Sequence, residues 1–213
     1  MRRVGVLLTG CGALDGGDIH EAVFAALALE RRGARVLHLA PGGEQADVAD
    51  HLTGSVRDDA GPRGMMSEAA RIARGRIEEL RAEAVSDLDA LIVVGGMGAA
   101  KSLFHDALVA GRAARLRGEI AAPLTAMRER GAPLGGSGLG YLALRALAPE
   151  WDFDPFAAAP AEAVADDARR LVWAPGFLVA RTLDEAARGI EAMVEKLLAL
   201  AASSGGRAEG AKR

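Results

Sequence analysis

Buried-strand patterns that end in glycine and lead into helical patterns recur along this chain, and they constrain its fold more than any other feature. The clearest is the candidate strand at residues 90–94 (ALIVV), which stands between Asp89 and the pair Gly95 and Gly96. An apolar run without polar alternation is typical of a strand that is covered on both faces of a sheet. Further candidate strands lie at residues 4–9, 35–39, 131–134 and 171–174.

Helical periodicity follows most of these runs. The predicted helices occupy residues 18–33, 65–80, 119–130, 139–147 and 182–200. The last of them opens with a TLDE capping box, and residues 57–64 are predicted as a surface loop. Repeated strand-then-helix order implies a mainly parallel sheet with right-handed crossovers, and ligands on such sheets bind beyond the carboxyl ends of the strands. Three glycine turns are expected at that edge, at residues 10–12, 95–98 and 135–138.

Length and composition fit one α/β domain. At 213 residues the chain suits a single core, so we predict one domain over residues 1–202 and a disordered tail over residues 203–213. Half of the residues are hydrophobic but only 4% are aromatic, so the core must consist mainly of Ala, Leu and Val. Such small side chains allow helices to pack closely on a sheet.

Charge, cysteine and histidine content argue against several classes of protein. The formal net charge of −3, from 26 basic and 29 acidic residues, gives no excess positive field for nucleic acid. The apolar run before Gly10 is too short for a signal-peptide core or a membrane span, so no membrane association and a cytoplasmic location are expected. The single cysteine, Cys11, cannot form an internal disulfide, and the four histidines lack metal-ligand spacing. Neither a metal nor a cofactor is therefore predicted.

Five motifs follow one another along the chain: LTGCG at residues 8–12, IHEAV at 19–23, HLTG at 51–54, EAARIARG at 68–75 and LIVVGGMGAAK at 91–101. Together they resemble the ElbB-type branch of the ThiJ/PfpI superfamily. The match spans residues 4–135 in order, and residues 180–197 resemble the last helix of the family more loosely. The resemblance implies a flavodoxin-like three-layer sandwich, the class I glutamine amidotransferase-like fold.

The resemblance also implies a site. In the family, a cysteine nucleophile stands on a strained elbow between a strand and a helix, and a glutamate on the first helix contacts it. Glu21 matches that glutamate, and its place at a helix N-terminus would favour its charged form. Gly95 and Gly96 match the turn whose backbone amides stabilise an oxyanion. Members are described as glyoxalase III-like enzymes, deglycases or small hydrolases, which implies a small carbonyl or anionic metabolite as ligand and, as in many relatives, a homodimer.

The chain departs from the family pattern at the elbow. Where the family has Gly-Lys-Pro-Leu-Gly, then two residues and the cysteine, residues 131–138 read GAPLGGSG, so the elbow position is Gly138. Glycine tolerates the strained backbone of a tight turn, but covalent thiol chemistry cannot occur there. The stretch between Leu147 and Leu171 is also shorter than the family pattern. The sequence therefore does not establish that the family's sheet-edge strand and its further pocket residues are present here.

Three other residues near this edge have both a functional and a structural interpretation. Cys11 could be a displaced nucleophile or a small residue packed against the elbow. Ser137 lies between glycines, but Leu139 stands where a Gly-x-Ser-x-Gly elbow needs its second glycine. Residues 136–140 could instead form a plain tight turn or an anion-binding nest of N–H groups. His20 is interpreted as a structural histidine near the pocket.

Two functions stay open. The first is an ElbB-like, glyoxalase III-type protein that converts small reactive carbonyls such as glyoxal to hydroxy acids, with weak or lost activity because position 138 is glycine. The second is a non-catalytic relative, a pseudoenzyme that keeps the pocket or the fold to bind a small molecule or a protein. An activated nucleophile would distinguish them, because its loss removes several orders of magnitude in rate.

Overall fold

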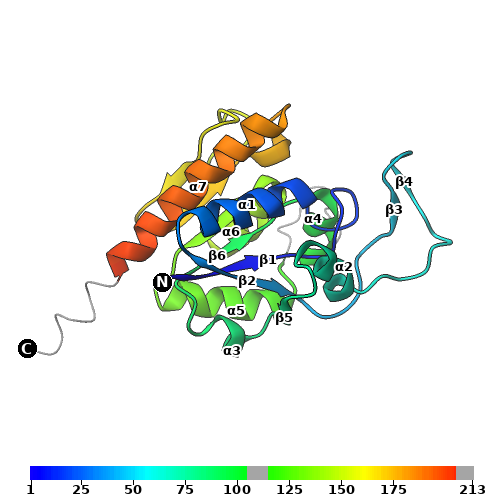
Figure 1. Ribbon diagram of the computed structural model, residues 1–213, viewed down its shortest axis with the longest axis horizontal. Helices are drawn as coiled ribbons and strands as arrows, with labels where there is room; N and C mark the ends of the chain where they lie inside the picture. Colours follow the sequence, from blue (N-terminus) through cyan, green and yellow to red (C-terminus); the bar gives the residue numbers. More distant parts are fainter. Residues whose placement is uncertain (105–114, 205–213) are drawn as a thin grey trace, which may run out of the picture.

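A seven-stranded, mainly parallel sheet forms the centre of the computed structural model, which describes residues 1–104 and 115–204 (Figure 1). The strands lie in the order β5, β2, β1, β6, β7, β9, β8, and all neighbours run parallel except β8 and β9. Their bounds are β1 Arg3–Leu7, β2 Arg35–Ala40, β5 Ile77–Glu79, β6 Ala90–Val93, β7 Leu134–Ser137, β8 Val164–Asp166 and β9 Leu171–Ala174. The predicted α/β class with a mainly parallel sheet is confirmed.

Helices cover both faces of this sheet (Figure 1). One face carries α1 (Ile19–Arg31), α2 (Met65–Ile72) and α7 (Leu183–Ser204), with α1 and α7 packed side by side. The other carries α3 (Ala82–Val85), α5 (Gly118–Glu129) and α6 (Tyr141–Leu147). A further short helix, α4 (Met97–Leu103), follows β6 at the carboxyl edge of the sheet. The three layers are those of the predicted sandwich.

Neighbouring residues of one strand point to opposite faces and so enter two separate cores. Ile92 of β6 packs in the core with residues of α1 and α7, whereas Leu91 and Val93 pack in the core with residues of α5. The buried face of α1 consists largely of alanines, among them Ala22 and Ala25. These small side chains let the helix lie close to the sheet, as the composition predicts.

The predicted helix at residues 65–80 is too long. α2 ends at Ile72, and β5, a strand absent from the prediction, begins at Ile77. Arg74 and Gly75 both adopt left-handed backbone conformations, with φ of 54° and 78°. The Gly75 N–H donates to a carbonyl of the last helical turn at 2.8 Å, which is how a left-handed pair ends a helix.

Boundaries also differ around the glycine turns. The strand predicted at residues 131–134 instead runs from Leu134 to Ser137 as β7, because β6 and β9 on either side pair with it despite its two glycines. A short 3-10 helix, η1 (Gly138–Gly140), follows, so the helix predicted from residue 139 begins at Tyr141. The short helices α3 and α4 had no counterpart among the predicted helices.

The C-terminal third of the chain completes the sheet and one helical layer. The stretch between Leu147 and Leu171, which is shorter than the family pattern, contains an edge strand, β8, which pairs antiparallel with β9. The predicted capping box is confirmed: the Glu185 N–H donates to Thr182 Oγ1 at 3.2 Å, and the Thr182 N–H donates to the Glu185 carboxylate at 3.3 Å. α7 continues to Ser204, so the first two residues of the predicted tail are helical, and the rest of it, residues 205–213, lies outside the described residues.

A hairpin projects from the body of the molecule between β2 and α2 (Figure 1). Its strands are β3 (Ala49–Asp50) and β4 (Ser55–Val56), and residues 51–63 are exposed, in agreement with the predicted surface loop. The buried Asp15 carboxylate holds the base of the hairpin by accepting a hydrogen bond from the Ala49 N–H at 2.9 Å. The hairpin is thus attached to the loop that leads into α1.

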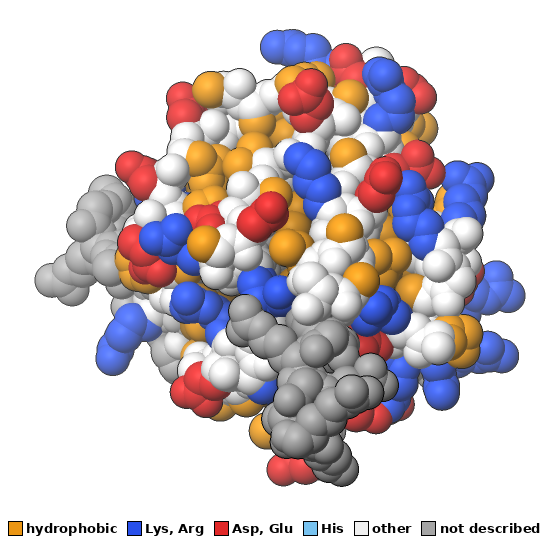
Figure 2. Space-filling model, turned by 90° about the vertical axis from the view of Figure 1, so that its left-hand side faces the viewer, with side chains coloured by type: hydrophobic (Ala, Val, Ile, Leu, Met, Phe, Trp, Pro, Cys, Tyr) orange, Lys and Arg blue, Asp and Glu red, His pale blue; other side chains and the backbone are white. Residues whose placement is uncertain are grey.

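Charged side chains of both signs are interspersed on the surface. Figure 2 shows this for the side of the molecule that carries the N-terminus, where basic and acidic side chains alternate with small apolar areas. No field of a single sign covers this face. Within the described ranges, no helix combines the length and the apolar character that a membrane span needs.

The loop at residues 10–18 packs tightly against α4 and so fixes the start of α1. The Met97 N–H, at the first position of α4, donates to the Ala13 carbonyl at 2.6 Å. The two segments approach this closely only because Gly98 has no side chain: a Cβ atom there would overlap the backbone of Asp15.

We predict that Gly98→Ala lowers the free energy of unfolding by about 3 kcal/mol, because the loop must move to admit a methyl group. Gly118→Ala is the matched control, since Gly118 also lies at the start of a helix but has open space around it. The control should be neutral or stabilising by up to about 1 kcal/mol. Urea unfolding measures both, and equal free energies for the two variants would contradict the tight contact.

Candidate functional site around Glu21

Glu21 lies in the first turn of α1, at the carboxyl edge of the sheet. Asp18 caps the helix by accepting a hydrogen bond from the Glu21 N–H at 3.0 Å. The Glu21 side chain points inward to the turns that follow β6 and β7, and the residue is only 2% exposed. A carboxyl group buried this deeply requires hydrogen-bond donors.

Separate segments of the chain supply those donors. Ser137, the last residue of β7, donates its hydroxyl to Glu21 Oε2 at 2.6 Å. The N–H of Phe177, in the 3-10 helix η2 (Gly176–Leu178), donates to Oε1 at 2.9 Å. The Gly95 N–H, just after β6, donates to Ser137 Oγ at 3.3 Å. Both carboxyl oxygens are therefore engaged, and the serine hydroxyl links the turn after β6 to the carboxyl group.

Burial raises the pKa of Glu21 from its ordinary value of 4.5 to about 7. Loss of solvation is the largest cause; the hydrogen bond from Ser137 lowers the pKa, and the charge of Asp18 raises it. The expectation that the helix N-terminus keeps this carboxyl charged is wrong, because burial outweighs the helix dipole. The group therefore changes protonation near neutral pH, the range in which general acids and bases operate.

Gly138 forms a left-handed turn against the Glu21 carboxyl. Its φ is +46°, and it follows β7 directly as the first residue of η1. A Cβ atom on residue 138 would lie 2.6 Å from Glu21 Oε1 and 2.9 Å from Oε2. The Trp173 indole N–H donates to the Gly138 carbonyl at 2.7 Å and holds the turn in place. The carboxyl group thus occupies the space into which a side chain at position 138 would project.

Other glycines complete the wall around the carboxyl. A Cβ atom at Gly95 would lie 3.0 Å from Oε2, and one at Gly176, which has a left-handed φ of +51°, would overlap Oε1. Gly176 was not among the predicted site residues, although the dipeptide Pro175-Gly176 directly after a predicted strand was a usable turn signal. Gly96 packs instead against the preceding loop, since its Cβ would lie 2.6 Å from the Gly16 carbonyl oxygen.

Cys11 and His20 are not among the groups that bind the carboxyl, as far as the described residues extend. The Cys11 N–H donates to the Gln45 side chain at 3.3 Å. Burial, followed by the negative charge of Glu68, raises the pKa of the Cys11 thiol, which disfavours a reactive thiolate. His20 is exposed and packs edge-on against Phe177, with ring centroids 5.8 Å apart, so its imidazole lies at the rim of the site.

Ser137 and Glu21 form a hydroxyl–carboxyl pair that can pass a proton between two oxygen atoms. Ser137 is fully buried, however, so its oxygen has no surface that a substrate could touch. In the part of the chain that the structure describes, no three His, Cys, Asp or Glu side chains gather closely enough to hold a metal ion. The candidate site is therefore a closed, hydrogen-bonded centre.

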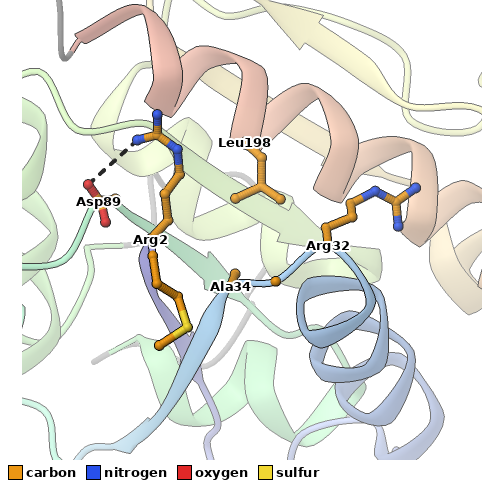
Figure 3. Close-up of a pocket in the computed structure, with 7 residues that line it drawn as sticks. Arg2, Arg32, Ala34, Asp89 and Leu198 are labelled. Atoms are coloured by element: carbon orange, nitrogen blue, oxygen red, sulfur yellow. Dashed lines mark ion pairs between the residues drawn. The ribbon is translucent and has the colours of Figure 1, made fainter.

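The cavity shown in Figure 3 lies at the opposite edge of the sheet. It has a volume of about 580 Å³, and its lining includes Arg2, Arg32, Ala34, Asp89 and Leu198. Arg2 and Asp89 form an ion pair at its wall, 3.6 Å apart. Because these residues stand near the amino ends of β1, β2 and β6, the cavity is not part of the site around Glu21.

The raised pKa of Glu21 predicts a pH-dependent stability. Between pH 4.5 and 7 the native state holds a proton that the unfolded chain releases, so the free energy of unfolding falls as pH rises through this range, by about 3 kcal/mol from this group. Glu21→Gln removes the ionisable group, so its free energy of unfolding should not show this decrease between pH 4.5 and 7. The exposed Glu83→Gln is the control and should follow the wild type. Parallel profiles for wild type and Glu21→Gln would contradict the assignment.

A second prediction concerns the space over Gly138. Gly138→Ala should lower the free energy of unfolding by roughly 3 kcal/mol, because alanine strains a left-handed turn and its methyl group also displaces the carboxyl. Gly33→Ala isolates the first effect, since Gly33 has a φ of +71° but no atom within 4 Å of its Cβ position. It should cost about 1 kcal/mol. Equal losses in chemical denaturation would show that the carboxyl moves aside freely.

Comparison with known proteins finds clear relatives, although no family model matches the chain. The chain is 33% identical over 224 residues to glutamine amidotransferase-like class 1 domain-containing protein 3, mitochondrial, of Homo sapiens; the alignment covers 93% of this chain and 83% of the human protein. It is 32% identical over 224 residues to the ES1 protein homolog, mitochondrial, of Rattus norvegicus, covering 93% of this chain and 84% of the rat protein.

Solved structures share the fold. A crystal structure of an isoprenoid biosynthesis protein with an amidotransferase-like domain from Ehrlichia chaffeensis has a TM-score of 0.81 at 24% identity, covering 92% of this chain and 99% of that one. A ThiJ/PfpI domain protein from Brachyspira murdochii has a TM-score of 0.55 at 11% identity, covering 94% and 96%. These similarities confirm the amidotransferase-like architecture that the sequence motifs imply.

The names of the relatives also correct one expectation. The human and rat proteins are both named as mitochondrial, so the predicted cytoplasmic location is wrong. The charge and hydropathy of a folded domain do not determine its compartment, because receptors recognise targeting signals and not the folded domain. With a third of positions identical over most of both sequences, the chain belongs to the family of glutamine amidotransferase-like class 1 domain-containing protein 3 and the ES1 proteins.

Proposed function

We propose that this chain is an ElbB-type member in which Gly138 replaces the nucleophilic cysteine, and that it acts by binding rather than by glyoxalase-type catalysis. One observation carries the proposal: the Glu21 carboxyl lies where the side chain of a nucleophile at position 138 would project. A covalent adduct with a carbonyl substrate needs a nucleophile at that point and room around it. The turn at Gly138 has neither a nucleophile nor room for an adduct.

The alternative nucleophiles lack support. Ser137 already donates to Glu21 and is fully buried. The thiol of Cys11 has a raised pKa, which lowers its thiolate fraction. Neither residue combines activation by a base with access to a substrate, the two conditions for covalent catalysis.

The same contacts argue against a small anion at this position. The amide of Phe177, which could receive an oxyanion, donates to the Glu21 carboxyl, and that of Gly95 donates to the serine hydroxyl. A charged ligand would have to replace a carboxyl group that the protein itself supplies. The binding role that we propose therefore belongs to the surface of the fold, which favours a protein partner over a small carbonyl or anionic metabolite.

Glyoxal turnover tests the proposal. Wild-type protein should produce hydroxy acid no faster than buffer, and Cys11→Ser and Ser137→Ala should leave that background unchanged. Gly138→Cys should also stay inactive, because its Cβ atom would collide with the Glu21 carboxyl. Turnover by wild type that disappears in Glu21→Gln would overturn the proposal. Strong activity in Gly138→Cys would show that the carboxyl does not block the position.

A further inference from the structure

The base of the projecting hairpin contacts the loop before α1 through a histidine and a buried aspartate. The side chain of His51, the first residue after β3, is 44% exposed, whereas that of Asp15 is only 1% exposed. Two of the sequence motifs meet at this contact, since Gly12 of LTGCG lies against His51 of HLTG. The HLTG motif plays no part in the site around Glu21, so its role has to be sought here.

Glycine at position 12 lets the imidazole and the carboxylate approach each other. Gly12 has a φ of +129°, and a Cβ atom there would lie 2.5 Å from Asp15 Oδ1 and 2.8 Å from His51 Nε2. Nε2 itself lies 3.7 Å from Oδ1, which is too far for a hydrogen bond. The two groups are therefore neighbours without a direct bond, and their approach depends on a residue that has no side chain.

The contacts of the His51 ring are those of a neutral imidazole. Nε2 accepts a hydrogen bond from the Leu14 N–H at 3.2 Å and so carries no proton, and Nδ1 lies 3.3 Å from the Ala49 carbonyl oxygen, to which it donates. Asp15 Oδ2 accepts from the Ala49 N–H, but Oδ1 is buried and has no donor among the described residues. A buried carboxylate oxygen without a donor costs stability, and the ring nitrogen that faces it is an acceptor as well.

Asp15 is the carboxylate that faces His51. In the described part of the chain, no other carboxylate lies within 4 Å of a nitrogen of this ring. The Cys11 thiol, on the same loop, is held neutral by its raised pKa, of which burial is the largest cause. Other charged groups of the hairpin and of the segments around its base are engaged elsewhere: Asp50 with the N–H groups of Leu52 and Thr53, Arg57 with Asp59, Lys101 of α4 with Asp47, and Asp18 with the Glu21 N–H.

We propose that protonation of His51 controls how firmly the hairpin is attached to the body of the protein. Histidine is the side chain whose charge commonly changes between pH 5 and 8. When the ring takes up a proton from water, Nε2–H turns to Asp15 Oδ1 and forms a charge-assisted hydrogen bond, while the N–H of the partly exposed Leu14 turns to solvent. Loss of the proton leaves Oδ1 without a donor again. The attachment is therefore strongest at acidic pH and weakens as pH rises through the neutral range.

Amide hydrogen exchange on the full chain tests this pH dependence. The Ala49 N–H joins the hairpin to Asp15, so its protection factor, the intrinsic exchange rate divided by the observed rate, reports local opening of the contact. In wild type this factor should be at least about tenfold higher at about pH 5.5 than at about pH 8, because the charged form gains a hydrogen bond. His51→Gln offers Leu14 an acceptor but does not titrate, so its factor should be the same at both pH values.

His20→Gln is the matched control for the loss of a histidine. His20 also stands beside a largely buried aspartate, with Nδ1 4.0 Å from Asp18 Oδ1, but that oxygen already accepts the Glu21 N–H. The variant should therefore keep the wild-type pH dependence of the protection factor at Ala49.

Asp15→Asn tests the partner of the imidazole. It removes the negative charge with little change of shape and should lower the proton affinity of His51, followed by the nitrogen NMR shifts of its ring, at least about tenfold. Thermal unfolding checks that the variants fold. A wild-type protection factor that does not change with pH, a His51→Gln variant that keeps the change, or an unchanged proton affinity in folded Asp15→Asn would each overturn the proposal. Glyoxal turnover has no bearing on these outcomes.

Discussion

The carboxyl group of Glu21 is buried among hydrogen-bond donors that come from distant parts of the chain. Ser137 and Phe177 bind it directly, and they stand 116 and 156 residues away in sequence. Without such partners a carboxyl group at this depth would cost several kcal/mol of stability. Because each donor lies at the end of a strand or in the turn that follows one, the group ties α1 to the carboxyl edge of the sheet.

Glycine makes room for this carboxyl group. At positions 95, 138 and 176 a Cβ atom would lie within 3.0 Å of a carboxyl oxygen, and two of the three residues adopt left-handed conformations that other residues rarely take. The left-handed turn at Gly138 lies directly against the Glu21 carboxyl. On the function proposed for this chain, the turn keeps the backbone of the elbow but carries no nucleophile.

The first helix connects the site to the surface. Its inner face of alanines packs on the sheet and its first turn supplies Glu21, while its outer face carries the stripe of Ile19, Val23 and Leu27. Large apolar side chains on the outer face of a surface helix are unusual, because that face normally carries polar residues.

The amino-acid sequence by itself determined the layered α/β architecture, the glycine turns that follow β1 and β6, and the capping box of α7, because apolar runs, helical periodicity and caps are local patterns. The turn predicted at residues 135–138 is mostly strand, since β7 extends to Ser137. The sequence did not reveal β5 and β8, short edge strands that exist because a neighbouring strand pairs with them. Nor could it establish that Glu21 has a pKa of about 7, or that Gly176 stands against it. Desolvation and close approach depend on segments far apart in sequence, so only the tertiary structure decided them.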